Sequence, residues 1–174
     1  NDLVRVLRRS DVAGLMVQRE LLGKDYAQRL CEAIPALGGG DAGSLHFLPE
    51  TPYLRWIVST GADLPPGFHD IAWLSGAAET VGEDVLRAVE AEVHSTDQMI
   101  EIYTSGSMAL PKGVKHNHGP VLFRARWLAG MMGLSRGKET NAMLPMFWVG
   151  GLMMYLMPNW VAGGLTLTGE QTMK

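Results

Sequence analysis

The stretch Tyr103-Thr-Ser-Gly-Ser-Met-Ala-Leu-Pro-Lys-Gly-Val114 follows a run of β-forming residues that we expect to be a strand, Gln98–Thr104. Three hydroxyl side chains and two glycines lie between Thr104 and Gly113. Such a loop can turn successive backbone N–H groups toward one point, where they and the hydroxyls bind an anion such as phosphate. The alternative is an ordinary Ser/Gly turn, but a plain turn does not need this density of hydroxyls ending in Pro-Lys-Gly. The stretch therefore predicts a phosphate-binding loop between a strand and its neighbour.

Two better-known nucleotide loops are excluded by spacing. A P-loop requires the pattern G-x-x-x-x-G-K-[ST], and here Pro111 stands where the second glycine must be and Gly113 where the hydroxyl must be. Gly38, Gly40 and Gly43 satisfy G-x-G-x-x-G, but no strand precedes them and a poor helix start follows. We interpret that second stretch as an ordinary loop.

Outward from the central loop, strand-like and helix-like segments alternate along the chain. This alternation predicts an α/β fold with a mostly parallel sheet and flanking helices. We expect strands at 11–17, 53–59, 98–104, 141–146 and 164–168, and helices at 24–34, 82–92, 119–133 and 150–157.

Composition and charge limit the class of protein. The 174 residues are 47% apolar and 19% charged, which is enough to bury a core, and a single cysteine excludes an internal disulfide. Residues 101–174 hold 7 basic and 3 acidic side chains, and no Asp or Glu lies between Glu101 and Glu139. This half of the chain should attract an anion. A merely solvated basic face is the alternative.

One segment is apolar enough to be compared with a membrane span, since 141–169 has no charged residue. A spanning helix needs about 20 uninterrupted apolar residues. Pro145, the Gly150-Gly151 pair and Pro158 interrupt the segment. Because these residues are helix breakers and turn signals, we expect a buried strand–helix–strand unit over 141–168 and no integral membrane span.

The central stretch resembles the phosphate loop of the adenylate-forming (AMP-binding) superfamily, whose pattern is Thr-Ser-Gly-Ser/Thr-Thr-Gly-x-Pro-Lys-Gly. His116-Asn-His-Gly119 fits the His-x-His-Gly stretch that often follows, and Leu144-Pro-Met-Phe-Trp-Val-Gly-Gly-Leu152 resembles the second core motif. Within the superfamily the chain looks most like an acyl-CoA synthetase, or fatty-acid CoA ligase. The resemblance implies that 1–174 is an incomplete part of the large N-terminal domain. Its phosphate loop would be 103–114, its acyl-side motif 144–152, and the C-terminal domain would be absent.

The resemblance also implies a reaction, in which a carboxylic acid, of the fatty type in our reading, reacts with ATP to an acyl-adenylate and then with coenzyme A to a thioester. It implies ATP, Mg²⁺ and coenzyme A as cofactors, small-molecule substrates, no nucleic acid, and a cytoplasmic location. The later motifs of the family carry its catalytic residues, so we assign none within 1–174 and expect this chain alone not to complete adenylation.

The residues that the resemblance assigns fall into two groups. Phe147, Trp148 and Gly150 would line the carboxylic acid. Thr104 would also be a ligand on the magnesium side of the nucleotide. The residues that would bind the nucleotide phosphates are Thr104, Ser105, Gly106, Ser107, Met108, Ala109 and Lys112.

The chain departs from the family pattern at three positions. Met108 stands where the family has Thr, Ala109 where it has Gly, and Trp148 where it usually has His. The first two departures favour a weakened nucleotide site, and they leave open a pseudo-enzyme module as an alternative. An adenylation domain with a different final acceptor is a second alternative.

Methionine and histidine give two further expectations. Nine of the 11 Met residues lie from Met108 onward, which favours an adaptable apolar acyl pocket, with ordinary core filling as the alternative. His116 and His118 are two residues apart without a third ligand, so we expect no metal site there. One of them should pack or form a hydrogen bond under the loop.

Overall fold

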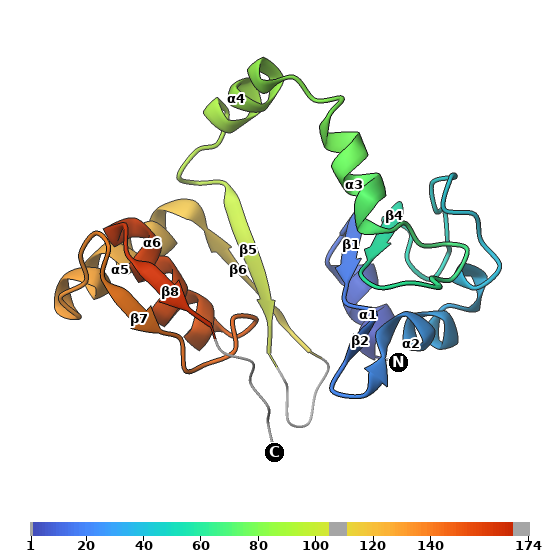
Figure 1. Cartoon of the computed structure of the whole chain (residues 1–174), viewed down its shortest axis with the longest axis horizontal. Coiled ribbons are helices and arrows are strands. Elements are labelled where there is room, and N and C mark those ends of the chain that lie inside the picture. The colour runs from blue at the N-terminus through green and yellow to red at the C-terminus, as the bar shows by residue number, and fades with distance from the viewer. Residues whose placement is uncertain (1, 105–110, 169–174) are drawn as a thin grey trace. The chain divides into compact units, whose positions relative to one another are not determined.

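The computed structural model describes residues 2–104 and 111–168 and divides the chain into two compact units, Asn1–Glu90 and Ala91–Lys174 (Figure 1). Each unit has a hydrophobic cluster of its own.

The first unit combines short helices with two strand pairs. Strand β1 pairs with β4 in parallel, from Gly14 opposite Trp56 to Val17 opposite Ser59, and β2 pairs with β3 as a short antiparallel hairpin. The elements are α1 (Asp2–Arg9), β1 (Gly14–Val17), β2 (Glu20–Leu21), β3 (Lys24–Asp25), α2 (Tyr26–Ala33), the 3₁₀ helix η1 (Pro35–Leu37), β4 (Trp56–Ser59), α3 (Ile71–Ala78) and α4 (Glu83–Ala91).

Helix α2 organises the core of this unit. Asp25 is its N-cap, because the Asp25 Oδ1 accepts a hydrogen bond of 2.8 Å from the Gln28 backbone N–H. Its apolar residues recur at three- and four-residue spacing, which places them on one buried face. The buried cluster is formed by Leu7, Ala27, Leu30, Ile34, Leu37, Leu54, Ile57 and Phe68.

The second unit contains an antiparallel hairpin, a long helix and a parallel strand–helix–strand unit. Strand β5 pairs with β6 antiparallel, and β7 pairs with β8 in parallel. Helix α5 packs on α6 through Val121, Ala125 and Met157. The elements are β5 (Gln98–Tyr103), β6 (Gly113–Asn117), α5 (His118–Met131), β7 (Glu139–Asn141), the π-helix η2 (Gly150–Leu156), α6 (Met157–Ala162) and β8 (Leu165–Leu167).

The fold class expected from the sequence is confirmed as mixed α/β with parallel strand pairs. Two antiparallel pairs accompany them among the described residues. Strand β6 was not expected, because its residues are largely exposed and include Lys115 and Asn117, so they form no apolar run. Helices α1 and α3 were not expected either.

The unit expected over 141–168 is a strand–helix–strand, as β7, η2 with α6, and β8 show. The expected strand 141–146 is wrong in its bounds, because β7 ends at Asn141. Pro145 cannot donate to a strand ladder, and its carbonyl instead accepts a hydrogen bond of 3.1 Å from the Trp148 N–H in a turn. Within the described ranges, no helix combines the length and apolar character that crossing a membrane requires.

Candidate functional site

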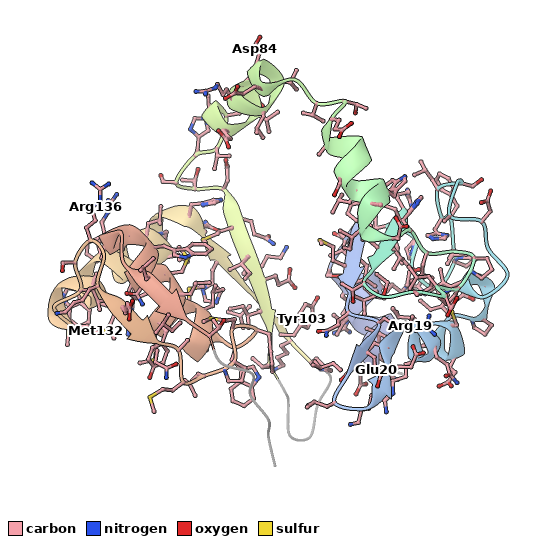
Figure 2. All side chains as sticks on the ribbon, viewed as in Figure 1. Arg19, Glu20, Asp84, Tyr103, Met132 and Arg136 are labelled. Carbon is pink, nitrogen blue, oxygen red and sulfur yellow. The ribbon has the colours of Figure 1, made fainter. Side chains whose placement is uncertain are left out.

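The predicted phosphate loop lies at the tip of the β5–β6 hairpin. Tyr103, labelled in Figure 2, is the last residue of β5 and pairs with Gly113, the first residue of β6. The Thr104 N–H donates to the Lys112 carbonyl at 3.0 Å, which closes the hairpin one step further. Of the predicted range 103–114, Tyr103 ends β5, and Gly113 and Val114 begin β6.

The two strands under the loop present charged groups side by side. Glu101 lies opposite Lys115 in the antiparallel register. A Cβ at Gly113 would overlap the Glu101 carboxylate, so a side chain at this position would displace that carboxylate. Gly113 therefore fits the close cross-strand approach at the base of the loop.

Strand β6 continues directly into α5, which is fixed at its start by backbone hydrogen bonds. The His118 N–H donates to the Asp97 carbonyl at 3.1 Å, and the Gly119 N–H donates to the Ser95 carbonyl at 2.7 Å. His116 lies opposite Ile100 on the hairpin and lines a groove described below. His116 and His118 belong to no group of three or more metal-ligating side chains in the described part of the chain.

The second motif forms a turn and the start of a π-helix. The Leu152 N–H donates to the Trp148 carbonyl at 3.0 Å, at the beginning of η2. A Cβ at Gly151 would overlap the Pro145 carbonyl, so only glycine allows the helix to approach the turn this closely. π-Helical turns are rare and frequently occur at functional sites. The Gly150-Gly151 pair thus determines where the motif begins its helix.

A partly buried hydrogen bond joins the two ends of this motif segment. The Thr140 hydroxyl on β7 donates to Oδ1 of Asn159 on α6 at 3.2 Å, and Asn159 is fully buried. The segment between them carries the second motif. Its ends are therefore anchored to each other as well as to the strand pair.

An apolar groove of about 380 Å³ lies between β6, α5 and η2. Most of its lining residues are aliphatic or are methionines, and Arg124 and His116 are the two with polar side chains. Such an environment suits an apolar chain with a polar end. The lining residues are His116, Pro120, Val121, Arg124, Leu128, Val149, Gly150, Met153 and Met154.

The structure brings only some of the predicted site residues to this groove. Gly150 lines it, whereas Phe147 and Trp148 are exposed beside it, with their rings edge to face at 5.6 Å and 81°. Thr104 and Lys112 are both exposed at the base of the loop. The predicted residues Ser105, Gly106, Ser107, Met108 and Ala109 lie outside the described residues.

Sequence reasoning missed the α5 wall of the groove. Pro120, Arg124 and Leu128 line it at four-residue spacing along α5. That spacing, directly after the His-x-His-Gly stretch, was the available signal. The methionines were expected either to line an apolar pocket or to fill the core. Met153 and Met154 line the groove, whereas Met157 is buried in the core.

Burial and hydrogen bonding displace individual pKa values in the first unit. Burial, with the neighbouring His46, lowers the pKa of His69, and Asp70 and Asp41 oppose this. The Gln28 backbone N–H and the Arg19 guanidinium hold the pKa of Asp25 below its usual range. Both groups lie in the unit that does not contain the predicted loop.

The chain belongs to the AMP-binding enzyme family, because the model of that family matches residues 3–172. The resemblance that the two motifs indicated is thereby confirmed. A curated relative, YngI of Bacillus subtilis (strain 168), provisionally named an acyl-CoA synthetase, is 27% identical over 150 residues, which cover 84% of this chain and 27% of the relative.

Solved structures share the fold. The anthranilate CoA ligase AuaEII in complex with anthranoyl-AMP matches with a TM-score of 0.70 at 23% identity, over 95% of this chain and 28% of that one. Acetoacetyl-CoA synthetase from Streptomyces lividans matches with a TM-score of 0.65 at 20% identity, over 97% of this chain and 24% of that one. The chain thus spans about a quarter of the length of these relatives.

Proposed function

We propose that the full-length protein containing this chain activates a carboxylic acid with an apolar chain and transfers the acyl group to coenzyme A. Family membership supports the reaction class. The groove between α5 and η2 is the observation that supports a substrate with an apolar chain. The named acyl-CoA synthetase and CoA ligase relatives agree with this class.

The reaction consists of two displacements. A carboxylate oxygen of the acid attacks the α-phosphorus of ATP, and pyrophosphate leaves with the electron pair of the broken P–O bond. The thiol sulfur of coenzyme A then attacks the acyl carbon, AMP leaves as an anion, and the thiol proton passes to the solvent. Both steps bring anions together, so they require positioning and positive charge.

The hairpin tip supplies groups suited to this task. Lys112 offers a mobile cation, and Thr104 offers a hydroxyl that can donate to a phosphate oxygen. Mg²⁺ prefers oxygen ligands, so the Thr104 hydroxyl oxygen fits the ion, which would neutralise phosphate charge when bound with ATP. In the proposal both residues bind the nucleotide, and the groove takes the acyl chain.

Lys112 has a matched control in Lys115, which is also exposed but lies opposite Glu101 on β6. In carboxylate-dependent pyrophosphate exchange by the full-length protein, Lys112→Ala should lower kcat/KM for ATP by about tenfold or more, because it removes a cation from the phosphates. Lys115→Ala should stay within about twofold of the unchanged protein. Equal effects of the two substitutions would contradict the phosphate role of Lys112.

A larger side chain in the groove tests whether the groove binds the acyl chain. Met153→Trp should exclude long-chain acids from exchange while short acids still react, because Met153 lines the groove between α5 and η2. Met132→Trp is the control, since Met132 is exposed at the end of α5 away from the groove lining. A loss of short and long acids in the same proportion would show that the groove does not hold the chain.

A non-catalytic module is the second candidate, and Met108 and Ala109 are the residues that favour it. If it is correct, the full-length protein should show no exchange with any acid and no binding of ATP in calorimetry. Measurable ATP binding together with exchange would exclude this candidate.

A further inference from the structure

Three polar side chains meet inside the second unit, where α6 packs on the β7–β8 pair (Figure 1). Thr140 is the middle residue of β7, Thr166 is the middle residue of β8, and the two lie opposite each other in the parallel register. Both are partly buried, whereas their neighbours on each strand are exposed. Because side chains alternate between the two faces of a strand, both threonines point to the same, more buried face.

Asn159 on α6 is the third side chain of this cluster, and it is fully buried. The Thr140 hydroxyl donates to its Oδ1 at 3.2 Å. The Asn159 backbone carbonyl also accepts a hydrogen bond of 2.8 Å from the Gly164 N–H, at the turn from α6 into β8. Asn159 is therefore fixed both to β7 and to the turn before β8.

Two polar atoms of the cluster, Asn159 Nδ2 and Thr166 Oγ1, have no hydrogen-bond partner among the described residues. The amide nitrogen is a donor and the hydroxyl oxygen can accept, so the two atoms are complementary. Buried polar groups are nearly always paired, since an unpaired one costs its desolvation free energy. Both atoms are already shielded from solvent within this unit. Parts of the protein outside this chain therefore cannot reach them while α6 stays packed on the strands.

The strand pair allows one amide to serve both threonines. Neighbouring strands lie about 4.8 Å apart, and the amide oxygen and nitrogen of asparagine share one carbon. An amide above the pair can thus present its oxygen to one strand and its nitrogen to the other. The Thr140 half of this arrangement is formed. The last torsion of an asparagine side chain is broad, so a small rotation of the amide can complete the other half.

We propose that Asn159 is a positioning residue of the groove: its amide clamps Thr140 through Oδ1 and Thr166 through Nδ2, and so holds η2 in place. Helix η2 continues directly into α6, and its Met153 and Met154 line the groove. A shift of α6 on the strands therefore shifts this wall of the groove. The inference rests on the proposed function, because that function places the acyl chain in the groove.

Stability alone does not call for a polar clamp at this position. Burying an amide costs desolvation free energy that its hydrogen bonds mainly offset, and apolar groups of the same shape are often as stable. The hydrogen bonds add direction, since an amide fits its partners in one arrangement, whereas aliphatic side chains pack in several. The clamp thus fixes where α6 and η2 lie.

Thr166→Val in the full-length protein tests whether the clamp exists. Valine has nearly the shape of threonine but lacks the hydroxyl. If Asn159 Nδ2 donates to Thr166, the substitution leaves the amide nitrogen unpaired and should lower the urea midpoint, as Thr140→Val should. Thr166→Ser keeps the hydroxyl and should recover most of the loss. An unchanged or raised midpoint in Thr166→Val would overturn the clamp, because removing a hydroxyl that has no partner costs nothing.

Amide hydrogen exchange of 150–156, followed by mass spectrometry, tests the positioning of η2 without requiring activity. Thr140→Val with Thr166→Val should speed exchange there by about threefold to tenfold, the factor that one buried hydrogen bond typically contributes. Exchange in α2 of the first unit is the internal control and should not change. The threonine variants are preferred to Asn159→Leu, which also alters packing at a fully buried position. Unchanged hydrogen exchange of 150–156 would show that the amide does not position η2.

Substrate kinetics test the consequence for the groove. In carboxylate-dependent pyrophosphate exchange, the double threonine variant should raise KM for a long-chain acid by about threefold or more and leave KM for ATP within about twofold. Equal rises for both substrates would overturn the positioning role. If the unchanged full-length protein shows no pyrophosphate exchange with any acid, the proposed function fails. The urea midpoints and the hydrogen exchange of η2 then still decide whether Asn159 positions this helix.

Discussion

Met108 and Ala109 change the chemistry of the predicted phosphate loop at the level of single side chains. A family-pattern Thr at 108 would add a hydroxyl that can donate to phosphate, and a thioether cannot. A glycine at 109 would allow backbone conformations that alanine disfavours. The described ends of the hairpin, Thr104 and Lys112, retain a hydroxyl and a cation. At the residue scale, the predicted loop therefore has a cation and one hydroxyl fewer than the family pattern.

We predict that restoring the pattern strengthens the site. In the full-length protein, Met108→Thr with Ala109→Gly should lower the Kd for ATP by about one to two powers of ten, because a hydrogen bond to a charged phosphate contributes about 1.5–3 kcal/mol. Isothermal titration calorimetry measures this directly. An unchanged Kd would mean that position 108 does not face the nucleotide, and the Lys112 experiment would then decide alone whether the loop does.

Among the elements, the contact between η2 and the Leu144–Pro145 turn is the tightest constraint on the second motif. The Gly151 backbone lies against the Pro145 carbonyl, where a Cβ has no space. Since the obstacle is backbone, it cannot move aside as a flexible side chain would. The same helix forms one wall of the groove, so a shift of η2 also reshapes the proposed acyl site.

Gly151→Ala should therefore destabilise the protein by about 1–3 kcal/mol, the usual cost of forcing an atom into a packed site. Gly130→Ala on α5 is the control, because a Cβ there meets nothing and alanine favours the helix by about 0.5–1 kcal/mol. Urea unfolding followed by circular dichroism measures both. Opposite signs are expected, and a neutral or stabilising Gly151→Ala would show that the turn yields.

A second element-scale prediction concerns the start of α2. Asp25 caps the helix and forms an ion pair with Arg19, whose Nη2 lies 2.8 Å from Asp25 Oδ2. Asp25→Ala should lower the urea midpoint for unfolding of the first unit, the usual effect of losing an N-cap. Asp25→Ser should recover much of that loss, because serine also caps helices. Equal losses in both variants would assign the effect to the ion pair instead.

On the scale of the whole molecule, the two units have different charge and different titrating groups. The basic excess and the groove belong to the second unit, while His69 belongs to the first. The His69 ring stacks on Trp73 with centroids 3.7 Å apart, and its backbone N–H donates to the Ile57 carbonyl at 2.8 Å. Protonation of this partly buried ring is opposed chiefly by burial.

This lowered pKa predicts how stability changes with pH. Because the unfolded chain binds a proton at His69 more readily than the folded chain, stability should fall as the pH drops through and below the ordinary histidine value near 6.5. His69→Phe keeps an aromatic ring against Trp73 but does not titrate, so its unfolding midpoint should depend less on pH between about pH 8 and pH 5. Identical pH profiles for the two proteins would contradict this assignment.

The sequence by itself determined the family, the α/β class and the place of the loop, because these depend on local patterns. Hydroxyl and glycine density, the alternation of apolar runs, and breakers such as Pro145 are properties of neighbouring residues. The helical spacing of Ala27, Leu30 and Ile34 agrees with the buried face of α2. For these features, a short segment contains the information.

Only the tertiary structure decided the pairing of β6 with β5, the groove wall contributed by α5, and the exposure of Phe123 and Trp127 on the same helix. Strand β6 is held by its hydrogen bonds to β5. Its own residues form no apolar pattern that would predict a strand. Helix α5 has apolar residues on two sides, so its sequence could not indicate which side packs. That choice depends on contacts with η2 and α6, which lie beyond β7 in the chain, and such contacts exist only once the chain has folded.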